Sequence, residues 1–141
     1  MTIKQLSVFL ENKSGRLTEV LEVLGGAGIN ITSLTIADTS EYGILRLIVS
    51  DAEKAFRLLK SNGFSANLTE VIALSVSHQA GSLAKVMKAL SDEQLSIEYT
   101  YAFCLGDKAI AVLRTDNPSR AFEIIANRRF TVVSENDVRN I

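Results

Sequence analysis

The sequence predicts an α+β protein built from two successive copies of one unit, each with the order strand–helix–strand–strand–helix–strand. Two observations support this prediction. Apolar residues follow the two-residue period of strands and the longer period of helices in regular succession. The same pattern then recurs 66 positions later, as Gly15 and Gly81 show. An internal repeat of this kind indicates two units that fold alike.

The repeat also contains identical residues at matching positions. Ten identities align without a gap when Gly15 is placed on Gly81, and nine of the ten are apolar. Much of what recurs is therefore a packing pattern, and the glycine pair is the exception. The ten pairs are Gly15/Gly81, Leu17/Leu83, Val20/Val86, Leu24/Leu90, Ile31/Ile97, Ile44/Ile110, Leu47/Leu113, Ala55/Ala121, Phe56/Phe122 and Phe64/Phe130.

The first unit opens with an alternating strand, followed by a helix with an apolar stripe. Gly25–Gly28 ends this helix. The next strand starts at Ile29 and changes phase after Ile31, which predicts a β-bulge. The apolar run Ile44–Val49 predicts a central strand. The residues of the first strand, first helix and shifted strand are Leu6, Val8, Leu10; Leu17, Val20, Leu21, Leu24; and Leu34, Ile36.

The rest of the first unit is a helix and a closing strand. Asp51 is placed to cap the helix, which carries Ala55, Phe56, Leu58 and Leu59. Asn62 and Gly63 form a helix stop, and a short strand follows from about Ser65.

The second unit repeats this order. Its third strand is the apolar run Ala109–Leu113, and Asn117 with Pro118 forms a good cap and first turn for the last helix. Phe130–Val133 predicts the closing strand. The first strand, first helix and second strand carry Ile72, Leu74, Val76; Leu83, Val86, Met87, Leu90; and Ile97, Tyr99, Tyr101, Phe103.

The order βαββαβ is that of a ferredoxin-like fold, an antiparallel four-stranded sheet with both helices on one face. We expect one domain at residues 1–69 and a second at 70–141, joined strand to strand near Leu68–Val71 without a flexible linker. A unit of this size buries only about 60% of its chain surface and is marginal alone. We therefore expect the units to pack together and the chain to form a homodimer.

Composition excludes several classes of function. The chain has 15 basic and 16 acidic residues, so it lacks the basic excess of a nucleic-acid or membrane surface. No apolar run approaches the length of a membrane helix, and MTIKQLSVFLENK does not have the pattern of a signal peptide. The single cysteine, Cys104, rules out an internal disulfide framework. We expect a cytoplasmic protein.

The residues also argue against specific chemistries of this fold. The strand YGILRLIVS lacks the aromatic platform of an RNA-binding domain. One cysteine and one histidine do not supply the paired soft ligands of a metal site. Arg16 invites comparison with an acylphosphatase, but its loop is not a phosphate cradle and the second copy has Ser82 there.

A Cys–His nucleophile pair is a further alternative. His78 and Cys104 fall at the ends of parallel strands with one strand between them, so we expect them about 10 Å apart, too far for proton transfer. No catalytic constellation remains, and we predict neither an enzyme, nor a cofactor, nor a metal.

The strand–helix turns read ENKSGRL and SHQAGSL. Glycine permits unusual backbone conformations and close approach of a ligand. The first N–H groups of a helix are unpaired and carry partial positive charge, so a carboxylate or another anion fits there. An ordinary helix-start turn is the structural alternative.

ENKSGRLTEVLEVLGGAGINI resembles the ACT domain, a ligand-sensing βαββαβ module of amino-acid metabolism, and Gly28-Ile29-Asn30-Ile31 matches the pattern that begins its second strand. Through the repeat the resemblance covers nearly the whole chain. The turns depart from the family at Ser14 and Ala80, where proline is frequent. The second copy has Gln94-Leu95-Ser96-Ile97 in place of the GINI motif.

The resemblance implies that a small amino acid binds at an interface between ACT-like domains. The turn of one domain would face the start of the second strand in its neighbour. Turn N–H groups would hold the ligand carboxylate, and Asn12, Asn30 or His78 would orient the amino group. The implied ligand-binding residues are Asn12, Ser14, Gly15, Arg16, Leu17, Ile29, Asn30, Ile31, His78, Gln79, Ala80, Gly81, Ser82, Leu83, Leu95, Ser96 and Ile97.

We therefore predict a regulatory amino-acid sensor, with an enzyme as the possible partner that it controls. The alternative is a protein-interaction module with degenerate pockets and no ligand. The aromatic stripe Tyr99, Tyr101 and Phe103 motivates the alternative, and its packing within the fold is the competing explanation.

Overall fold

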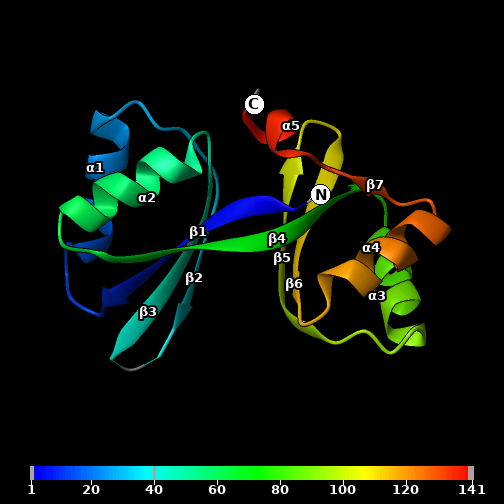
Figure 1. Cartoon of the computed structure of the whole chain (residues 1–141). Helices are drawn as coiled ribbons and strands as arrows, with labels where there is room; N and C mark the ends of the chain where they lie inside the picture. The colour runs from blue at the N-terminus through cyan, green and yellow to red at the C-terminus, as the bar shows by residue number, and fades with distance from the viewer. Residues whose placement is uncertain (1, 40, 140–141) are drawn as a thin grey trace. The chain divides into compact units, whose positions relative to one another are not determined.

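The computed structural model describes residues 2–39 and 41–139 (Figure 1). Strands and helices follow one another in the predicted order. Their bounds are β1 Ile3–Glu11, α1 Arg16–Gly26, β2 Ile31–Asp38, β3 Tyr42–Val49, α2 Ala52–Ser61, β4 Ser65–Ser77, α3 Ser82–Asp92, β5 Ile97–Leu105, β6 Lys108–Thr115, α4 Pro118–Asn127, β7 Thr131–Val132 and α5 Glu135–Arg139.

The chain forms two compact units. The first unit is Lys4–Thr69 together with the segment that starts at Asn136. The second unit is Glu70–Glu135 together with the N-terminal residues up to Ile3. The proposed ACT-like domains, 1–69 and 70–141, remain a prediction about the repeat, and their residues 1, 40, 140 and 141 lie outside the described part.

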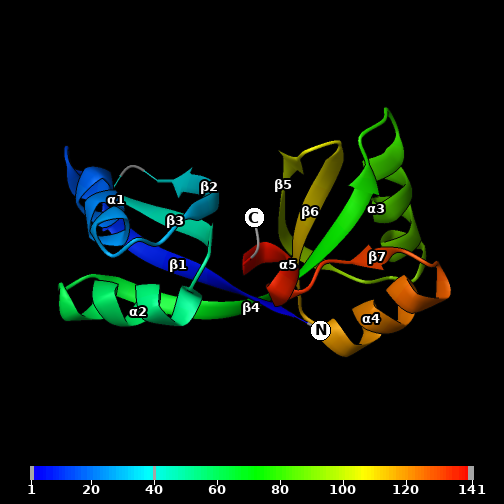
Figure 2. The same cartoon turned by 90° about the horizontal axis from the view of Figure 1, so that it is seen from above.

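The first unit contains the strand order β2-β3-β1-β4, with β3 antiparallel to both β1 and β2. Helices α1 and α2 lie together on one face of this sheet (Figures 1 and 2). Alternate strand residues meet the apolar stripes of the helices there. The buried core consists of Leu6, Val8, Leu10, Val20, Leu24, Ile29, Leu45, Leu47, Val49, Ala55, Leu59, Phe64 and Ala66.

Three local features predicted for the first unit are confirmed: the irregularity in the second strand, the cap of α2 and the end of α2. The register of β2 against β3 shifts between Ile31 and Ser33, which is the predicted irregularity. Asp51 caps α2 by accepting a hydrogen bond from the N–H of Lys54 at 3.1 Å. The helix ends at Ser61, and Gly63 follows with φ 84°.

The second unit has the same architecture, with the order β5-β6-β4-β7 and α3 and α4 on one face (Figures 1 and 2). Asn117 caps α4 as predicted, and Pro118 occupies the first turn. The core is built from Ile72, Leu74, Val86, Leu90, Leu95, Leu113, Ala121, Ile124 and Ile125. The predicted ferredoxin-like fold is therefore confirmed in both units.

Three local predictions were wrong. The short strand expected from Ser65 and the strand through Ile72 are one strand, β4, and neither glycine nor proline lies between them. The register of β5 against β6 shifts between Ile97 and Tyr99, so Ile97 joins the helix-side core while the aromatic stripe occupies the other face. The closing strand shrinks to Thr131–Val132, and helix α5 was not predicted.

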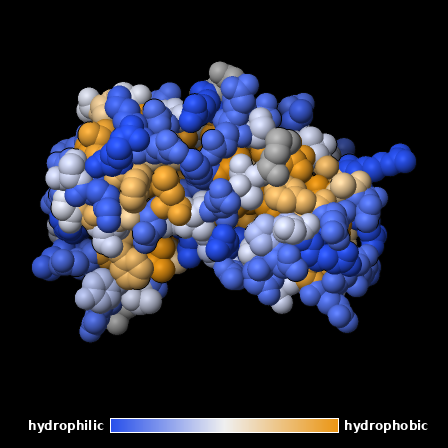
Figure 3. All heavy atoms as spheres, in the orientation of Figure 1, coloured by the Kyte–Doolittle hydropathy of each residue, from blue (hydrophilic) through white to orange (hydrophobic). Residues whose placement is uncertain are grey.

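Figure 3 shows a surface on which hydrophilic residues predominate and small apolar patches interrupt them. Within the described ranges, no helix has the length and apolar character needed to span a bilayer.

Replacement of Leu24 by alanine tests the core assignment. Leu24 is fully buried in the first-unit core, so Leu24→Ala should lower the free energy of unfolding by about 2–5 kcal/mol. The matched change Leu34→Ala, at a side chain that is 40% exposed, should cost about 1 kcal/mol or less. Urea denaturation measures both, and equal losses would contradict the assignment.

Candidate functional site

Two helices begin at a glycine in the left-handed conformation. Gly15 precedes α1 with φ 86° and ψ −9°, and Gly81 precedes α3 with φ 87° and ψ −9°. A Cβ at either position would meet no other atom within 4 Å. The backbone conformation, and not a lack of space, therefore requires glycine.

These two helices also start without a side-chain cap. By contrast, α2 and α4 are capped by Asp51 and Asn117, which each accept a first-turn N–H at 3.1 Å. First-turn N–H groups have no partner within their helix and carry partial positive charge. In α1 and α3 the first N–H donates to a carbonyl of the preceding turn, Arg16 to Lys13 at 3.3 Å and Ser82 to Gln79 at 3.1 Å. The next two N–H groups, of Leu17 and Thr18 in α1 and of Leu83 and Ala84 in α3, have no side-chain cap in the part of the chain that the structure describes and are available to an anion.

The turn before α1 borders a cavity of about 240 Å³, the first-unit pocket. The backbone N–H of Asn12 donates to the carbonyl of Glu41 at 3.0 Å and ties the turn to the β2–β3 hairpin. Three predicted site residues, Asn12, Arg16 and Leu17, line the cavity. The full lining is Leu10, Glu11, Asn12, Lys13, Arg16, Leu17, Ile36, Asp38 and Gly43.

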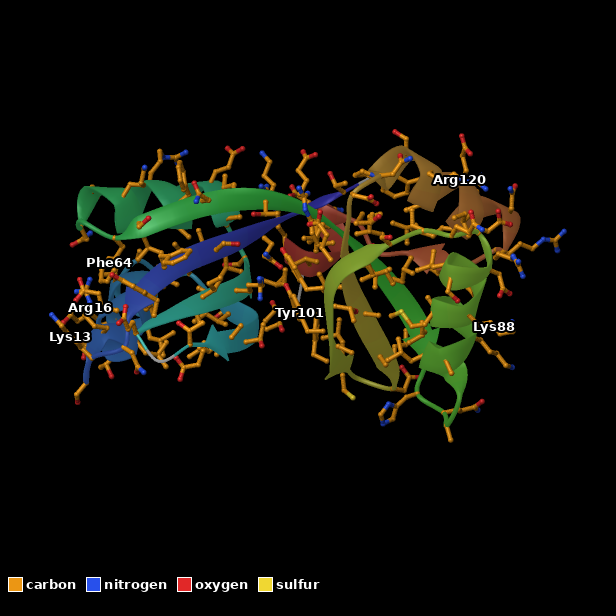
Figure 4. All side chains as sticks on the ribbon, turned by 90° about the horizontal axis from the view of Figure 1, so that it is seen from below. Lys13, Arg16, Phe64, Lys88, Tyr101 and Arg120 are labelled. Carbon is orange, nitrogen blue, oxygen red and sulfur yellow. The ribbon has the colours of Figure 1, made fainter. Side chains whose placement is uncertain are left out.

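The two cationic side chains of this pocket, Lys13 and Arg16, are each paired with a carboxylate of the protein. Lys13 Nζ lies 2.9 Å from a Glu11 carboxylate oxygen, and its hydrogen bond and charge lower the pKa of Glu11 below the usual value. Arg16 donates to Glu19 at 2.8 Å, and its guanidinium lies 4.7 Å from the centre of the Phe64 ring (Figure 4). Arg16 Nε is buried without a hydrogen-bond partner. The guanidinium is therefore held close to the protein and does not extend freely into solvent.

The turn before α3 borders a larger cavity of about 440 Å³, the second-unit pocket. Four predicted residues, His78, Gln79, Ala80 and Leu83, line it. Leu83 is 39% exposed although it is large and apolar, so its side chain is available to a ligand. The full lining is Val76, Ser77, His78, Gln79, Ala80, Leu83, Ala102, Phe103, Cys104 and Ala109.

The separation predicted for His78 and Cys104 was wrong. The Sγ of Cys104 lies 3.7 Å from Nδ1 of His78, and both residues are exposed. Cys104 is on β5 and His78 directly follows the last residue of β4, and these two strands lie on either side of β6, as expected. Ala109 of β6 pairs with Cys104 and with Val76, and His78 lies two residues beyond Val76. Strand spacing alone ignored the reach of the side chains.

The two pockets occupy equivalent places in the repeat. Eight of the nine residues of the first-unit pocket have their counterpart, 66 positions later, in the second-unit pocket. Only Arg16 lacks one, since Ser82 does not line the second cavity. The same backbone therefore forms a cavity in both units, with different side chains around it.

The family resemblance implied that the residues at the start of the second strand of each unit bind the ligand, but these residues lie away from the two pockets. Ile29 is buried in the first-unit core, and the main chain of Asn30 bonds to Ser50 through both its N–H and its carbonyl at 3.0 and 2.9 Å. Leu95 and Ile97 belong to, or pack against, the second-unit core. None of Ile29, Asn30, Ile31, Leu95, Ser96 or Ile97 lines a described pocket.

Ser14, Gly15, Gly81 and Ser82 stand in the turns but do not line the cavities either. Sequence reasoning instead missed the far end of the second strand in each unit. Because β1 and β3 are antiparallel, the end of β1 lies beside the start of β3, and Leu10 pairs with Gly43. This topological signal was available from the predicted fold and identifies Ile36, Asp38, Gly43, Ala102, Phe103, Cys104 and Ala109.

In the part of the chain that the structure describes, no three His, Cys, Asp or Glu side chains gather closely enough to hold a metal ion.

A comparison with known families identifies the chain. The family described as the ACT domain pair matches residues 1–141. The chain belongs to the ACT domain pair family. The resemblance seen in the glycine turn and the GINI motif is therefore confirmed. No curated protein matches this ACT domain pair with significant similarity.

Solved structures include similar chains. Protein BT0572 from Bacteroides thetaiotaomicron is 44% identical over 100% of this chain and 98% of that chain, with a TM-score of 0.95. The regulatory subunit of aspartate kinase from Thermus thermophilus, in its ligand-free form, is 14% identical over 88% of this chain and 91% of that chain, with a TM-score of 0.64. The regulatory subunit of aspartate kinase from Thermus flavus is 17% identical over 88% of this chain and 90% of that chain, with a TM-score of 0.61. At these identities the kinase subunits share the fold.

Two glycine substitutions in and before α1 should have opposite signs. Gly15→Ala forces an alanine into the left-handed region and should cost about 1–2 kcal/mol of unfolding free energy. Gly25→Ala, in an exposed helical position with open space around it, should gain about 0.5–1 kcal/mol. Urea denaturation measures both changes. A Gly15→Ala protein as stable as the wild type would refute the requirement for glycine.

Proposed function

We propose that this ACT domain pair is a regulatory sensor that binds a small amino acid at an interface between ACT-like domains, and that it does not catalyse a reaction. One observation carries the proposal. In each unit an uncapped helix start, formed by a left-handed glycine, borders a cavity. The other two long helices, which border neither of these cavities, carry side-chain caps.

The helix start suits the carboxylate of an amino acid. Its open N–H groups donate to an anion, and the helix dipole favours negative charge at this end. An α-amino group needs acceptors in turn, and Asn12 in one turn and His78 in the other are exposed and line their cavities. A ligand group left without a partner costs about 1–3 kcal/mol, so these side chains select among amino acids.

A ligand that contacts two domains at once can regulate how those domains associate. In the homodimer that we propose, the start of the second strand of one copy, with Asn30 or Ser96, closes the cavity of the other. Both residues are exposed. A ligand that contacts two copies binds the associated arrangement better than the separated one, which is the differential affinity that allostery requires. A cytoplasmic enzyme of amino-acid metabolism is the proposed recipient of the signal.

A protein-interaction module remains the second candidate. The register of β5 places Tyr99, Tyr101 and Phe103 opposite Arg114, Val112 and Ile110. This is the sheet face away from α3 and α4, and Figure 4 shows Tyr101 on that side. If protein binding through this face is the function, Tyr101→Ala should abolish co-purification of a partner while Asn30→Ala leaves it intact. The reverse pattern would support the sensor.

A thermal-shift screen of the twenty amino acids tests the sensor directly. The right amino acid, at a concentration about 100 times its Kd, should stabilise the protein by about 2.7 kcal/mol and raise Tm by several degrees. The amide of the same amino acid is the matched control. It lacks the carboxylate and should lose most of the shift. Absence of a shift with all twenty at millimolar concentration would contradict the proposal.

A further inference from the structure

We infer that the second-unit pocket is the principal binding site, and that its ligand is an amino acid with a large apolar side chain. This inference rests on the proposed function and makes it specific. It follows from the comparison of two cavities that occupy equivalent places in the repeat but differ in volume, charge and shape.

Volume separates the two pockets first. Ligand sites in proteins are cavities of about 300–1,000 Å³. The second-unit pocket, at about 440 Å³, lies within this range, and the first-unit pocket, at about 240 Å³, lies below it. At one equivalent position the side chain is smaller in the larger pocket, because Ile36 of the first pocket is replaced by Ala102 in the second.

Charge separates them again. Glu11, Lys13, Arg16 and Asp38 are four of the nine residues around the first pocket. Lys13 is paired with Glu11, and Arg16 is engaged by Glu19 and Phe64, so a ligand would have to compete with contacts already made. The first pocket is therefore smaller and charged, and its two cations, Lys13 and Arg16, are already paired with protein carboxylates.

The second pocket carries the opposite chemistry. Six of its ten lining residues are apolar, namely Val76, Ala80, Leu83, Ala102, Phe103 and Ala109, and none is Asp, Glu, Lys or Arg. A charged ligand side chain would lose its water there without gaining an opposite charge, which is strongly unfavourable. An apolar side chain would instead cover Leu83 and the sheet beside it.

The polar groups of this pocket lie where the ligand backbone would be. Ser77, His78 and Gln79 follow one another in the turn, directly before the open start of α3. The carboxylate and amino groups would meet this rim, and the side chain would point toward Ala102 and Ala109. Each methylene added to a side chain in an apolar pocket gains roughly tenfold or more in affinity. Leucine or phenylalanine should therefore bind at least about 100-fold more tightly than alanine.

A cysteine in the second-unit pocket can report whether a ligand is bound there. Cys104 is the single cysteine of the chain, is exposed, and lines the cavity 3.7 Å from His78. Iodoacetamide alkylates such a thiol: a C–S bond forms, the C–I bond breaks, iodide leaves, and the thiol proton passes to His78 or to water. A bound amino acid that covers Cys104 should slow this reaction by the factor 1 + [L]/Kd, which is about tenfold at 10 Kd.

The experiment combines this reporter with a pair of matched variants. Alkylation of the full chain is followed by mass spectrometry with leucine, phenylalanine, alanine, glutamate and lysine present in turn. We expect protection by leucine or phenylalanine at concentrations at least about 100-fold below those needed with alanine, and no protection by glutamate or lysine. Urea-unfolded protein should react at the same rate with and without each amino acid.

Ala102→Ile then gives the second pocket the residue of the first. It should abolish both the protection of Cys104 and the thermal shift. Isoleucine suits a strand, so the variant should remain folded, which its circular dichroism checks. Ala37→Ile is the control: Ala37 is also exposed on the second strand of its unit but lines neither cavity, so binding should be unchanged.

The outcomes distinguish this inference from the proposed function. Binding of an amino acid that survives Ala102→Ile, or that favours glutamate, lysine or alanine, overturns the assignment of pocket and ligand but leaves the sensor intact. Thermal stabilisation by an apolar amino acid without protection of Cys104 also overturns the assignment. A screen in which no amino acid binds removes the sensor and this inference together.

Discussion

The left-handed glycine at the start of α1 and α3 is the constraint on which the site depends. It reverses the chain between a buried strand and a helix packed on that strand. Since glycine has no side chain, it leaves the first-turn N–H groups without a local cap. The same turn then becomes one wall of a cavity. The other wall is the end of the second strand, which antiparallel pairing through the third strand brings to the same edge of the unit.

Duplication preserved this geometry while the lining diverged. The dihedral angles of Gly15 and Gly81 differ by 1° in φ, yet Asn12, Ile36 and Asp38 of one pocket correspond to His78, Ala102 and Cys104 of the other. Packing and backbone conformation restrict the core and the turn, because a cavity or a strained residue costs the whole unit stability. Residues at the rim contact solvent and can change without such a cost. One unit can therefore have an apolar pocket while the equivalent pocket of the other unit is lined by ion-paired side chains.

Most of the fold could be predicted from local patterns. The caps at Asp51 and Asn117, the stop at Asn62-Gly63 and the bulge after Ile31 each depend on neighbours in sequence, and each is present. Features set by distant pairing were not predicted. They include the continuity of β4, the bulge between Ile97 and Tyr99, and the short helix α5. The contact of His78 with Cys104 belongs to the same class, because it joins side chains from the ends of two strands that β6 separates.

The sequence by itself determined the repeat, the order of the elements, the ACT family and the two turns that begin a helix with glycine. These properties depend on hydrophobic periodicity and on backbone preferences, which are local. Only the tertiary structure decided which residues face those turns across each unit. Strand pairing brings the remaining lining residues to the cavities, and sequence separation conceals that proximity. These residues are Ile36, Asp38, Gly43, Ala102, Phe103, Cys104 and Ala109. The difference between a small pocket with ion-paired side chains and a larger apolar one depends on side-chain contacts that exist only once the chain is folded.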